Sequence, residues 1–245
     1  MRPLTAHDLL RVWERGETEH PLDRALTLLA PACPKLTRKQ LASLSIGQRD
    51  ALLLALREKT FGQKLQASAD CPQCRKRLEF ALDVADFQIP SADEQPQYSE
   101  FTFTAEGLSI RARFPNSMDL ASVARQQDVS RARRILARRC VIELHDGDRE
   151  FDSEELPEIV ISALSAEIAG REPLFEIELD LRCAECGHGW FAVFDIVAFL
   201  WAEISASAQR LLGEIHALAR AYGWSEAETL ALSARRRQLY IQMVT

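Results

Sequence analysis

Apolar residues in the first quarter of the chain recur at the spacing of amphipathic helices. Pro21 suits the first position of one such helix, where its missing N–H has no intrahelical partner to lose. Thr37–Gln40 and Ser45–Gln48 fit the Ser/Thr-x-x-Gln capping box, in which two side chains satisfy free N–H groups at a helix start. Gly62 is suited to ending the last of these helices. We therefore predict a helical region over residues 1–63.

Beyond this region the apolar positions alternate, which indicates strands with one buried face. One alternating stretch follows a first C-x-x-C pair, and another leads into a second C-x-x-C pair. Their apolar positions are Leu78, Phe80, Leu82 and Val84 in the first stretch and Phe175, Ile177, Leu179 and Leu181 in the second. Residues 101–104 and 108–114 flank a Gly-containing turn and predict a β-hairpin. Residues 88–98 contain two prolines and are predicted to form a linker or loop.

Helical spacing returns in the middle and at the end of the chain. We predict helices over residues 117–144 and 157–169, with a turn at residues 146–148 between them. A long helix is expected from about Asp195 to Arg220, and Ser225–Glu228 forms a third capping box beyond it.

These elements predict a mainly helical α+β fold with a discontinuous four-cysteine zinc ribbon and a small β-hairpin insertion. Here a knuckle means a C-x-x-C turn at the tip of a two-stranded hairpin. The expected division is an N-terminal helical region (1–63), a first zinc knuckle (64–87), a hairpin and helical insertion (88–173), a second zinc knuckle (174–195) and a C-terminal helical tail (196–245).

The two C-x-x-C pairs are the most informative chemical feature of the sequence. Cys71 and Cys74 form one pair, and Cys183 and Cys186 form the other. Two knuckles that face each other supply four sulfurs in a tetrahedral arrangement, which is a closed structural zinc site. The 108 residues between Cys74 and Cys183 greatly exceed the usual ribbon spacer of about 15–20 residues. The matching strand context of both pairs nevertheless favours one shared Zn²⁺ ion.

Two other uses of these cysteines stay open at this point. A dithiol redox pair needs a helix start after its first cysteine to lower the thiol pKa, whereas a strand is expected after Cys74. The thiols could also be unligated. His188 lies in the second turn and is expected to decorate it rather than to bind the metal. Cys33 and Cys140 stand alone and are expected to be small buried residues.

Composition narrows the class of protein. Apolar residues make up 47% of the chain, enough for a core, and the formal net charge of −6 weighs against a dedicated nucleic-acid binder. No run of 18 apolar residues and no N-terminal signal pattern is present, so we expect a cytoplasmic protein without membrane insertion. No phosphate-binding loop or hydrolase motif occurs, and the acidic residues Glu154, Glu155 and Glu158 fit the start of a helix.

Two clusters could serve binding. The basic run Arg125–Arg139 is expected to be a solvated or acid-paired helix face, with a nucleic-acid surface as the alternative. Trp201, Tyr222, Trp224 and Tyr240 are expected to cluster in the C-terminal tail, either as core residues or as an interaction surface.

Several stretches in order along the chain resemble a known family. They are Ser45–Asp50, Cys183–His188, Phe194–Ile196, Phe199–Glu203 and Ala219–Glu226. Together they resemble the T-even-phage-type baseplate hub assembly family, found in phages and bacterial contractile injection systems. The resemblance covers nearly the whole chain, and the segment Ala221–Glu226 is its most specific part.

The resemblance implies a non-enzymatic assembly chaperone or baseplate component that binds hub, spike or tube proteins of a contractile tail. It implies no catalytic residues, so only the four cysteines carry over as site residues. The alternative from the residues themselves is a zinc-ribbon nucleic-acid-binding protein that uses the Arg125–Arg139 face.

Overall fold

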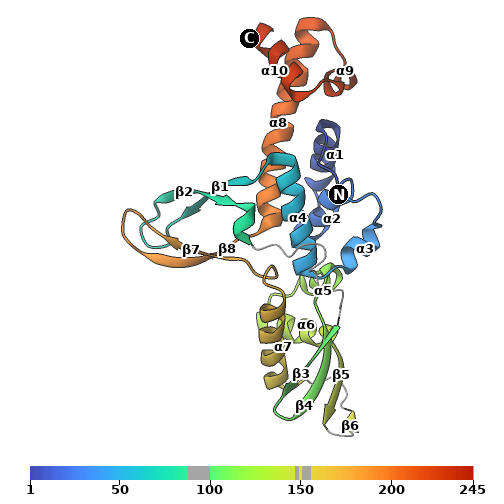
Figure 1. The fold of residues 1–245 in the computed structure, drawn as a ribbon, viewed down its shortest axis with the longest axis vertical. Helices are drawn as coiled ribbons and strands as arrows, with labels where there is room; N and C mark the ends of the chain where they lie inside the picture. The colour runs from blue at the N-terminus through green and yellow to red at the C-terminus, as the bar shows by residue number, and fades with distance from the viewer. Residues whose placement is uncertain (88–99, 147–148, 151–155, 245) are drawn as a thin grey trace.

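The computed structural model describes residues 1–87, 100–146, 149–150 and 156–244. It is an elongated α+β fold with a central helical body, two β-hairpins projecting to one side, an insertion at one end and a pair of short helices at the other (Figure 1). The predicted linker at 88–98, the turn residues 147–148, Glu154 and Glu155 lie outside the described residues. Within the described ranges, no helix is long and apolar enough to span a bilayer.

Five helices build the central body. They are α1 (Ala6–Gly16), α2 (Pro21–Leu29), α3 (Arg38–Ser43), α4 (Ile46–Phe61) and α8 (Ile196–Tyr222). The predicted capping boxes at Thr37 and Ser45 are confirmed, Pro21 occupies the first turn of α2, and Gly62 ends α4 with a φ of +94°. A further box at Thr5 begins α1. The core joins chain segments far apart in sequence, because α8 packs against α1, α2 and α4.

The interior of the body is leucine-rich and also contains a buried arginine that forms an ion pair. Leu28, Leu53 and Leu200 are fully buried in it. Arg57 of α4 is also buried and binds both carboxylate oxygens of Glu203 on α8, at 2.9 and 2.7 Å. The same guanidinium donates to the carbonyl oxygens of Gly62 and Lys64, so it fixes the exit from α4 into the first hairpin.

The first hairpin consists of β1 (Lys64–Asp70) and β2 (Arg77–Asp83), followed by the short 3-10 helix η1 (Val84–Phe87). The second consists of β7 (Glu178–Arg182) and β8 (Gly189–Val193). Each is an antiparallel two-stranded sheet, with Asp70 opposite Arg77 and Arg182 opposite Gly189 at the tips. The hairpins lie side by side (Figure 1), and Phe87 stacks on Phe194 at their bases with ring centroids 5.0 Å apart.

The insertion has its own core beneath the central body (Figure 1). Its helices are α5 (Ser117–Val123), α6 (Val129–Cys140) and α7 (Glu158–Arg171); its strands are β3 (Glu100–Ala105), β4 (Leu108–Arg113), β5 (Val141–Asp146) and β6 (Arg149–Glu150). The strands form one antiparallel sheet in the order β3-β4-β5-β6.

The predicted hairpin is confirmed as β3 and β4, although it belongs to a larger sheet. The prediction of one helix over residues 117–144 was wrong, because α5, α6 and the start of β5 occupy this range. Val141 and Leu144 lie in β5, which pairs with β4. The β-branched residues Val141 and Ile142 favour a strand once a neighbouring strand offers hydrogen bonds.

A polar joint connects the insertion to the body. The Ile46 N–H donates to the Pro115 carbonyl oxygen at 3.0 Å, and the buried Arg49 donates to the Ser117 hydroxyl oxygen. On the other side, Glu172 accepts hydrogen bonds from the Ser45 hydroxyl and the Gly47 N–H. Burial raises the pKa of Glu172, although these two donors oppose the shift. The start of α4 thus positions both ends of the insertion.

The C-terminal unit folds back on the far end of α8. It contains α9 (Glu226–Ala231) and α10 (Ala234–Val244), and the predicted capping box at Ser225 is confirmed. The rings of Tyr222, Trp224 and Tyr240 pack against one another, and the Trp224 centroid lies 4.8 and 4.9 Å from those of the two tyrosines. The expectation that Trp201 joins this cluster was wrong, because its ring lies in the body beneath Arg24.

Candidate metal centre

The two C-x-x-C turns have the same backbone construction. In the first, the Cys71 N–H donates to the Lys76 carbonyl oxygen and the Arg75 N–H donates to the Cys71 carbonyl oxygen, both at 2.9 Å. In the second, Cys183 bonds with His188 and Gly187 in the same pattern and at the same distances. The matched backbones make both turns knuckles in the predicted sense.

One position in each turn has a left-handed backbone. Gly187 has a φ of +73° and Arg75, at the equivalent place, has a φ of +59°. Such a conformation favours glycine because a Cβ atom crowds the following carbonyl. The first knuckle is therefore the more strained of the two, as the arginine at this position predicts.

The knuckles bring all four predicted cysteines together. The Sγ atoms of Cys71 and Cys186 lie 3.7 Å apart, and those of Cys74 and Cys183 lie 3.6 Å apart. All four sulfurs lie within 4.8 Å of one another. A disulfide needs about 2.05 Å between sulfurs, whereas a tetrahedron of sulfurs about 2.3 Å from one zinc has edges of roughly 3.8 Å. The spacing fits a shared metal ion and not a disulfide pair.

Backbone N–H groups face the sulfurs. The pKa of Cys183 is lowered to about 7, first by a hydrogen bond from the Cys186 N–H and also by one from the Glu185 N–H. The Lys76 N–H donates to Cys74 and lowers the pKa of that thiol, but burial and the neighbouring sulfurs outweigh it and raise the pKa to about 12. The His188 N–H donates to Cys186 at the equivalent position. Such donors stabilise thiolates, which are the form that binds a metal.

Exposure differs between the four positions. Cys71 and Cys183 are buried, Cys74 is half-buried, and Cys186 is exposed. The first cysteine of each pair therefore lies in the interior between the hairpins, and the second lies toward solvent. A metal could enter from the side of Cys186.

The other candidate residues lie outside this centre. The imidazole of His188 stacks on the Trp190 ring, with centroids 6.1 Å apart, and is not part of the four-sulfur group. Cys33 and Cys140 are buried in the body and in the insertion, as predicted. The residues after Cys74 form β2 and not a helix. The first pair therefore lacks the helix N-terminus that lowers the thiol pKa in a reactive dithiol.

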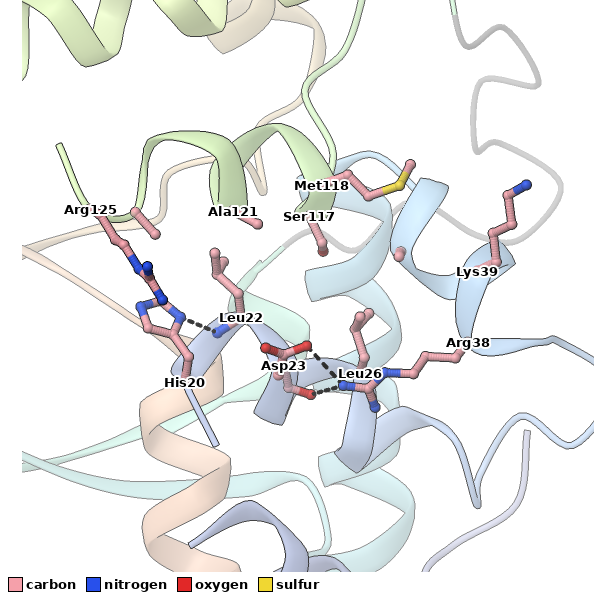
Figure 2. Close-up of a pocket in the computed structure, with 12 residues that line it drawn as sticks. His20, Leu22, Asp23, Leu26, Arg38, Lys39, Ser117, Met118, Ala121 and Arg125 are labelled. Atoms are coloured by element: carbon pink, nitrogen blue, oxygen red, sulfur yellow. Dashed lines mark hydrogen bonds and ion pairs between the residues drawn. The ribbon is translucent and has the colours of Figure 1, made fainter. Parts of the chain in front are cut away.

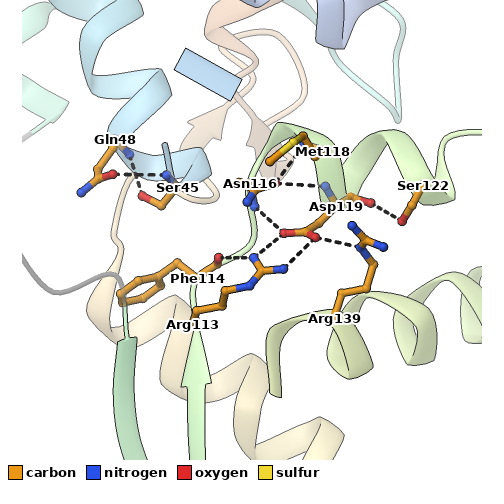
Figure 3. Close-up of polar contacts among 9 residues, drawn as sticks. All are labelled: Ser45, Gln48, Arg113, Phe114, Asn116, Met118, Asp119, Ser122 and Arg139. Atoms are coloured by element: carbon orange, nitrogen blue, oxygen red, sulfur yellow. Dashed lines mark hydrogen bonds and ion pairs between the residues drawn. The ribbon is translucent and has the colours of Figure 1, made fainter. Parts of the chain in front are cut away.

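Part of the basic run Arg125–Arg139 is paired with acids. Arg139 and Arg113 both bind the carboxylate of Asp119, which is buried (Figure 3). Arg133 forms an ion pair with Glu158 on α7 at 2.6 Å. These two arginines of the run stabilise the insertion, as expected for an acid-paired face.

The Asp119 network was not predicted. Asn116 caps α5, and the carboxylate of Asp119 accepts a hydrogen bond from the Asn116 N–H, which makes a capping box at the joint (Figure 3). Burial acts to raise the pKa of Asp119, but Arg113, the Asn116 N–H and Arg139 outweigh burial and lower it. The Asn-x-x-Asp spacing is a sequence signal for such a cap.

Comparison with known proteins places the chain in a class of tail proteins. A family model described as T4 bacteriophage base plate protein matches residues 6–201, which include both knuckles, the insertion and the first turns of α8. The chain therefore belongs to the T4 bacteriophage base plate protein family, and the predicted relationship to phage baseplate proteins is confirmed. The segment Ala221–Glu226, the most specific part of the resemblance, lies beyond this match. No curated protein and no solved structure matches the chain.

Proposed function

We propose that the protein is a non-enzymatic assembly chaperone or structural component of a contractile-tail baseplate, which binds hub, spike or tube proteins. The observation that carries this proposal is the family match over residues 6–201. A closed set of four thiolates supports a structural role, because it leaves no open metal position for a reacting water.

The proposed metal is one structural Zn²⁺ ion held by Cys71, Cys74, Cys183 and Cys186. The sulfur spacing and the N–H groups that face the sulfurs fit this assignment. When bound, the ion joins two hairpins whose own strands contribute few buried residues. Structural zinc contributes on the order of 10 kcal/mol to folding in small zinc peptides, and the leucine core of the body makes the protein less dependent on the ion than such peptides are.

The shape of the molecule supports a role in holding partners together. The hairpin arm, the insertion and the C-terminal unit project in different directions from the central body (Figure 1). Large apolar side chains are exposed on two of these parts: Phe191 and Val193 on β8 are 69% and 65% exposed, and Met243 on α10 is 71% exposed. Phe191 and Val193 lie on the same face of β8, and adjoining exposed apolar side chains support a protein contact surface there.

A nucleic-acid role through the Arg125–Arg139 face is the alternative. The ion pairs of Arg133 and Arg139 with acidic residues reduce the charge available for phosphate. A steep fall of affinity for DNA or RNA with salt would favour this alternative.

The test is co-expression of the tagged chain with each hub, spike and tube protein of the same tail. We expect a stable complex with at least one of them after size-exclusion chromatography, and none with the tag alone. If the folded chain forms no complex with any of these proteins, the proposed function is wrong.

A further inference from the structure

A groove of about 550 Å³ lies where the central body meets the insertion. Its walls are α2 and α5, and α3 lies at one end (Figure 2). The middle is apolar: Leu22 and Leu26 lie one helical turn apart on α2, Ala121 lies opposite them on α5, and the Met118 side chain runs from α5 toward α3. The Met118 side chain is 44% exposed, so part of this apolar surface is open to a partner.

Basic groups stand at both ends of this apolar floor. Arg125 and His20 lie at one end, and Arg38 and Lys39 lie at the other (Figure 2). Asp23 is the one acidic lining residue among those described, and Arg38 binds its carboxylate at 3.0 Å. Within the described ranges, Lys39 and Arg125 form no ion pair. The groove is thus a basic site on a chain whose formal net charge is −6.

We infer that this groove binds a short helical segment of a partner baseplate protein, with apolar residues at its centre and acidic residues toward both ends. The inference rests on the proposed function and specifies the chemistry of the partner. A helix seated between two helices places an apolar row into the floor, which is a common mode of peptide recognition. Its acidic ends would meet Arg125 and Lys39, and complementary charge favours correct docking.

A peptide fits the groove better than a nucleic acid does. Single-stranded nucleic acid binds on aromatic platforms, and of the described lining residues His20 alone has an aromatic ring. The Nδ1 atom of His20 is already engaged, because it accepts a hydrogen bond from the Leu22 N–H. A phosphate backbone would also offer no apolar group to pack against the floor between the basic ends.

Because of the position of the groove, a bound segment would link the central body to the insertion. Its lining comes from α2 and α3 of the body and from α5 of the insertion. A bound helix would therefore contact both parts at once and would fix the insertion against the body, beside the polar joint at Ser45 and Asn116.

Charge reversal tests the inference on the full-length chain with the hub, spike or tube protein that it binds. We expect the double variant Lys39→Glu with Arg125→Glu to weaken binding at least about tenfold and to flatten its salt dependence. Both side chains are exposed, so the fold should persist. The matched control is Arg134→Glu with Arg138→Glu, two exposed arginines of α6 that do not line the groove.

A second variant tests the apolar floor. Met118→Asp places a carboxylate in the first turn of α5, where an acidic residue is compatible with the helix start. We expect it to reduce partner binding at least about tenfold, because a charge replaces an apolar contact and repels an acidic partner. Circular dichroism and thermal unfolding of each variant check that folding is retained.

Photo-cross-linking identifies the occupant. A benzoylphenylalanine at position 118 should cross-link to a partner peptide whose sequence carries apolar residues between acidic ones, whereas the same probe at Val129, exposed on α6, should not. Cross-links to a second copy of this chain, to nucleic acid or to a basic segment would overturn the inference. Full binding by both groove variants would do the same while leaving the proposed function intact, whereas absence of any wild-type complex would contradict the proposed function itself.

Discussion

The Sγ atom of Cys71 lies 3.7 Å from the Sγ atom of Cys186, although Cys186 follows 115 positions later in the chain. The second short contact, between Cys74 and Cys183, also joins the two hairpins and not the two halves of one C-x-x-C pair. Each knuckle thus supplies half of the site, and the proposed metal would hold the hairpins together across the whole insertion.

Loss of one thiol should release the metal. We expect the wild-type chain to contain about one zinc per molecule and Cys183→Ser to contain almost none, with a lower unfolding temperature, because three ligands bind zinc far less tightly than four. Elemental analysis and thermal unfolding measure both effects. Cys33→Ala is the control, since that buried thiol lies in the body away from the site. Fully folded wild-type protein that contains no metal after gentle purification would contradict the proposal.

The left-handed turn positions should respond in opposite ways. Gly187→Ala is expected to destabilise the second knuckle by about 1 kcal/mol, because a Cβ atom meets no neighbour within 4 Å and only the backbone is strained. Arg75→Gly relieves the backbone strain at the equivalent position, but glycine also increases the entropy of the unfolded chain. We therefore expect the free energy of unfolding to rise by less than about 1 kcal/mol. Urea unfolding of the zinc-loaded protein gives both values, and equal losses in the two variants would refute this account of the turns.

Removing the charge of Asp119 should loosen the insertion alone. Its carboxylate is 1% exposed and holds Arg113, Arg139 and the cap of α5 together. Because loss of a buried partner leaves two guanidinium groups poorly compensated, we expect Asp119→Asn to cost about 2–3 kcal/mol. Hydrogen exchange should rise in α5 and α6 and stay unchanged in α1 and α8. Glu158→Gln breaks the exposed pair with Arg133 and should cost less than about 0.5 kcal/mol.

The start of α1 should show a specific pH dependence. Burial acts to raise the pKa of Asp8, but hydrogen bonds from Arg2 and Thr5 outweigh it and lower the pKa to about 2. A depressed carboxyl pKa stabilises the fold above the unfolded value near pH 4, and this stabilisation is lost as the pH falls toward about 2. Asp8→Asn should therefore lower the free energy of unfolding by about 1–2 kcal/mol at pH 7 and by little at pH 2. The value at pH 7 is smaller than the pKa difference alone implies, because Arg2 is half-exposed and solvent screens its charge.

Unfolding followed from pH 7 to pH 2 measures this difference. Glu14→Gln, which removes an exposed carboxylate from the same helix, is the control and should show no comparable pH dependence. A constant difference between wild type and Asp8→Asn over the whole range would show that the ion pair is not the cause.

Local signals made much of the fold predictable from the sequence. The boxes at Thr37, Ser45 and Ser225 mark helix starts because their hydrogen bonds span only three residues. The cysteine set was also predictable, since two identical turn motifs in strand contexts point to one metal-binding arrangement even at long range.

Features that depend on distant contacts were not predictable in the same way. Val141 belongs to a strand only because β4 lies beside it, and Trp201 packs in the body because α1 and α2 return to meet α8. The groove combines residues of the first 42 positions with residues 117–125, and no local pattern relates these segments. Tertiary packing decided these positions.

The separation of Cys71 from Cys186 also sets an order of events during synthesis. At about 5–20 residues per second, the 115 positions from Cys71 to Cys186 take roughly 6–23 s to translate. The buried residues of the insertion core lie between Phe101 and Ile168, and Phe175 packs against them, whereas the body core needs residues from Leu4 to Leu211. Nascent chains arrested with residue 175 outside the ribosome should resist protease in the insertion but not in α1 to α4. The helices that leave the ribosome first then finish folding after the insertion that follows them.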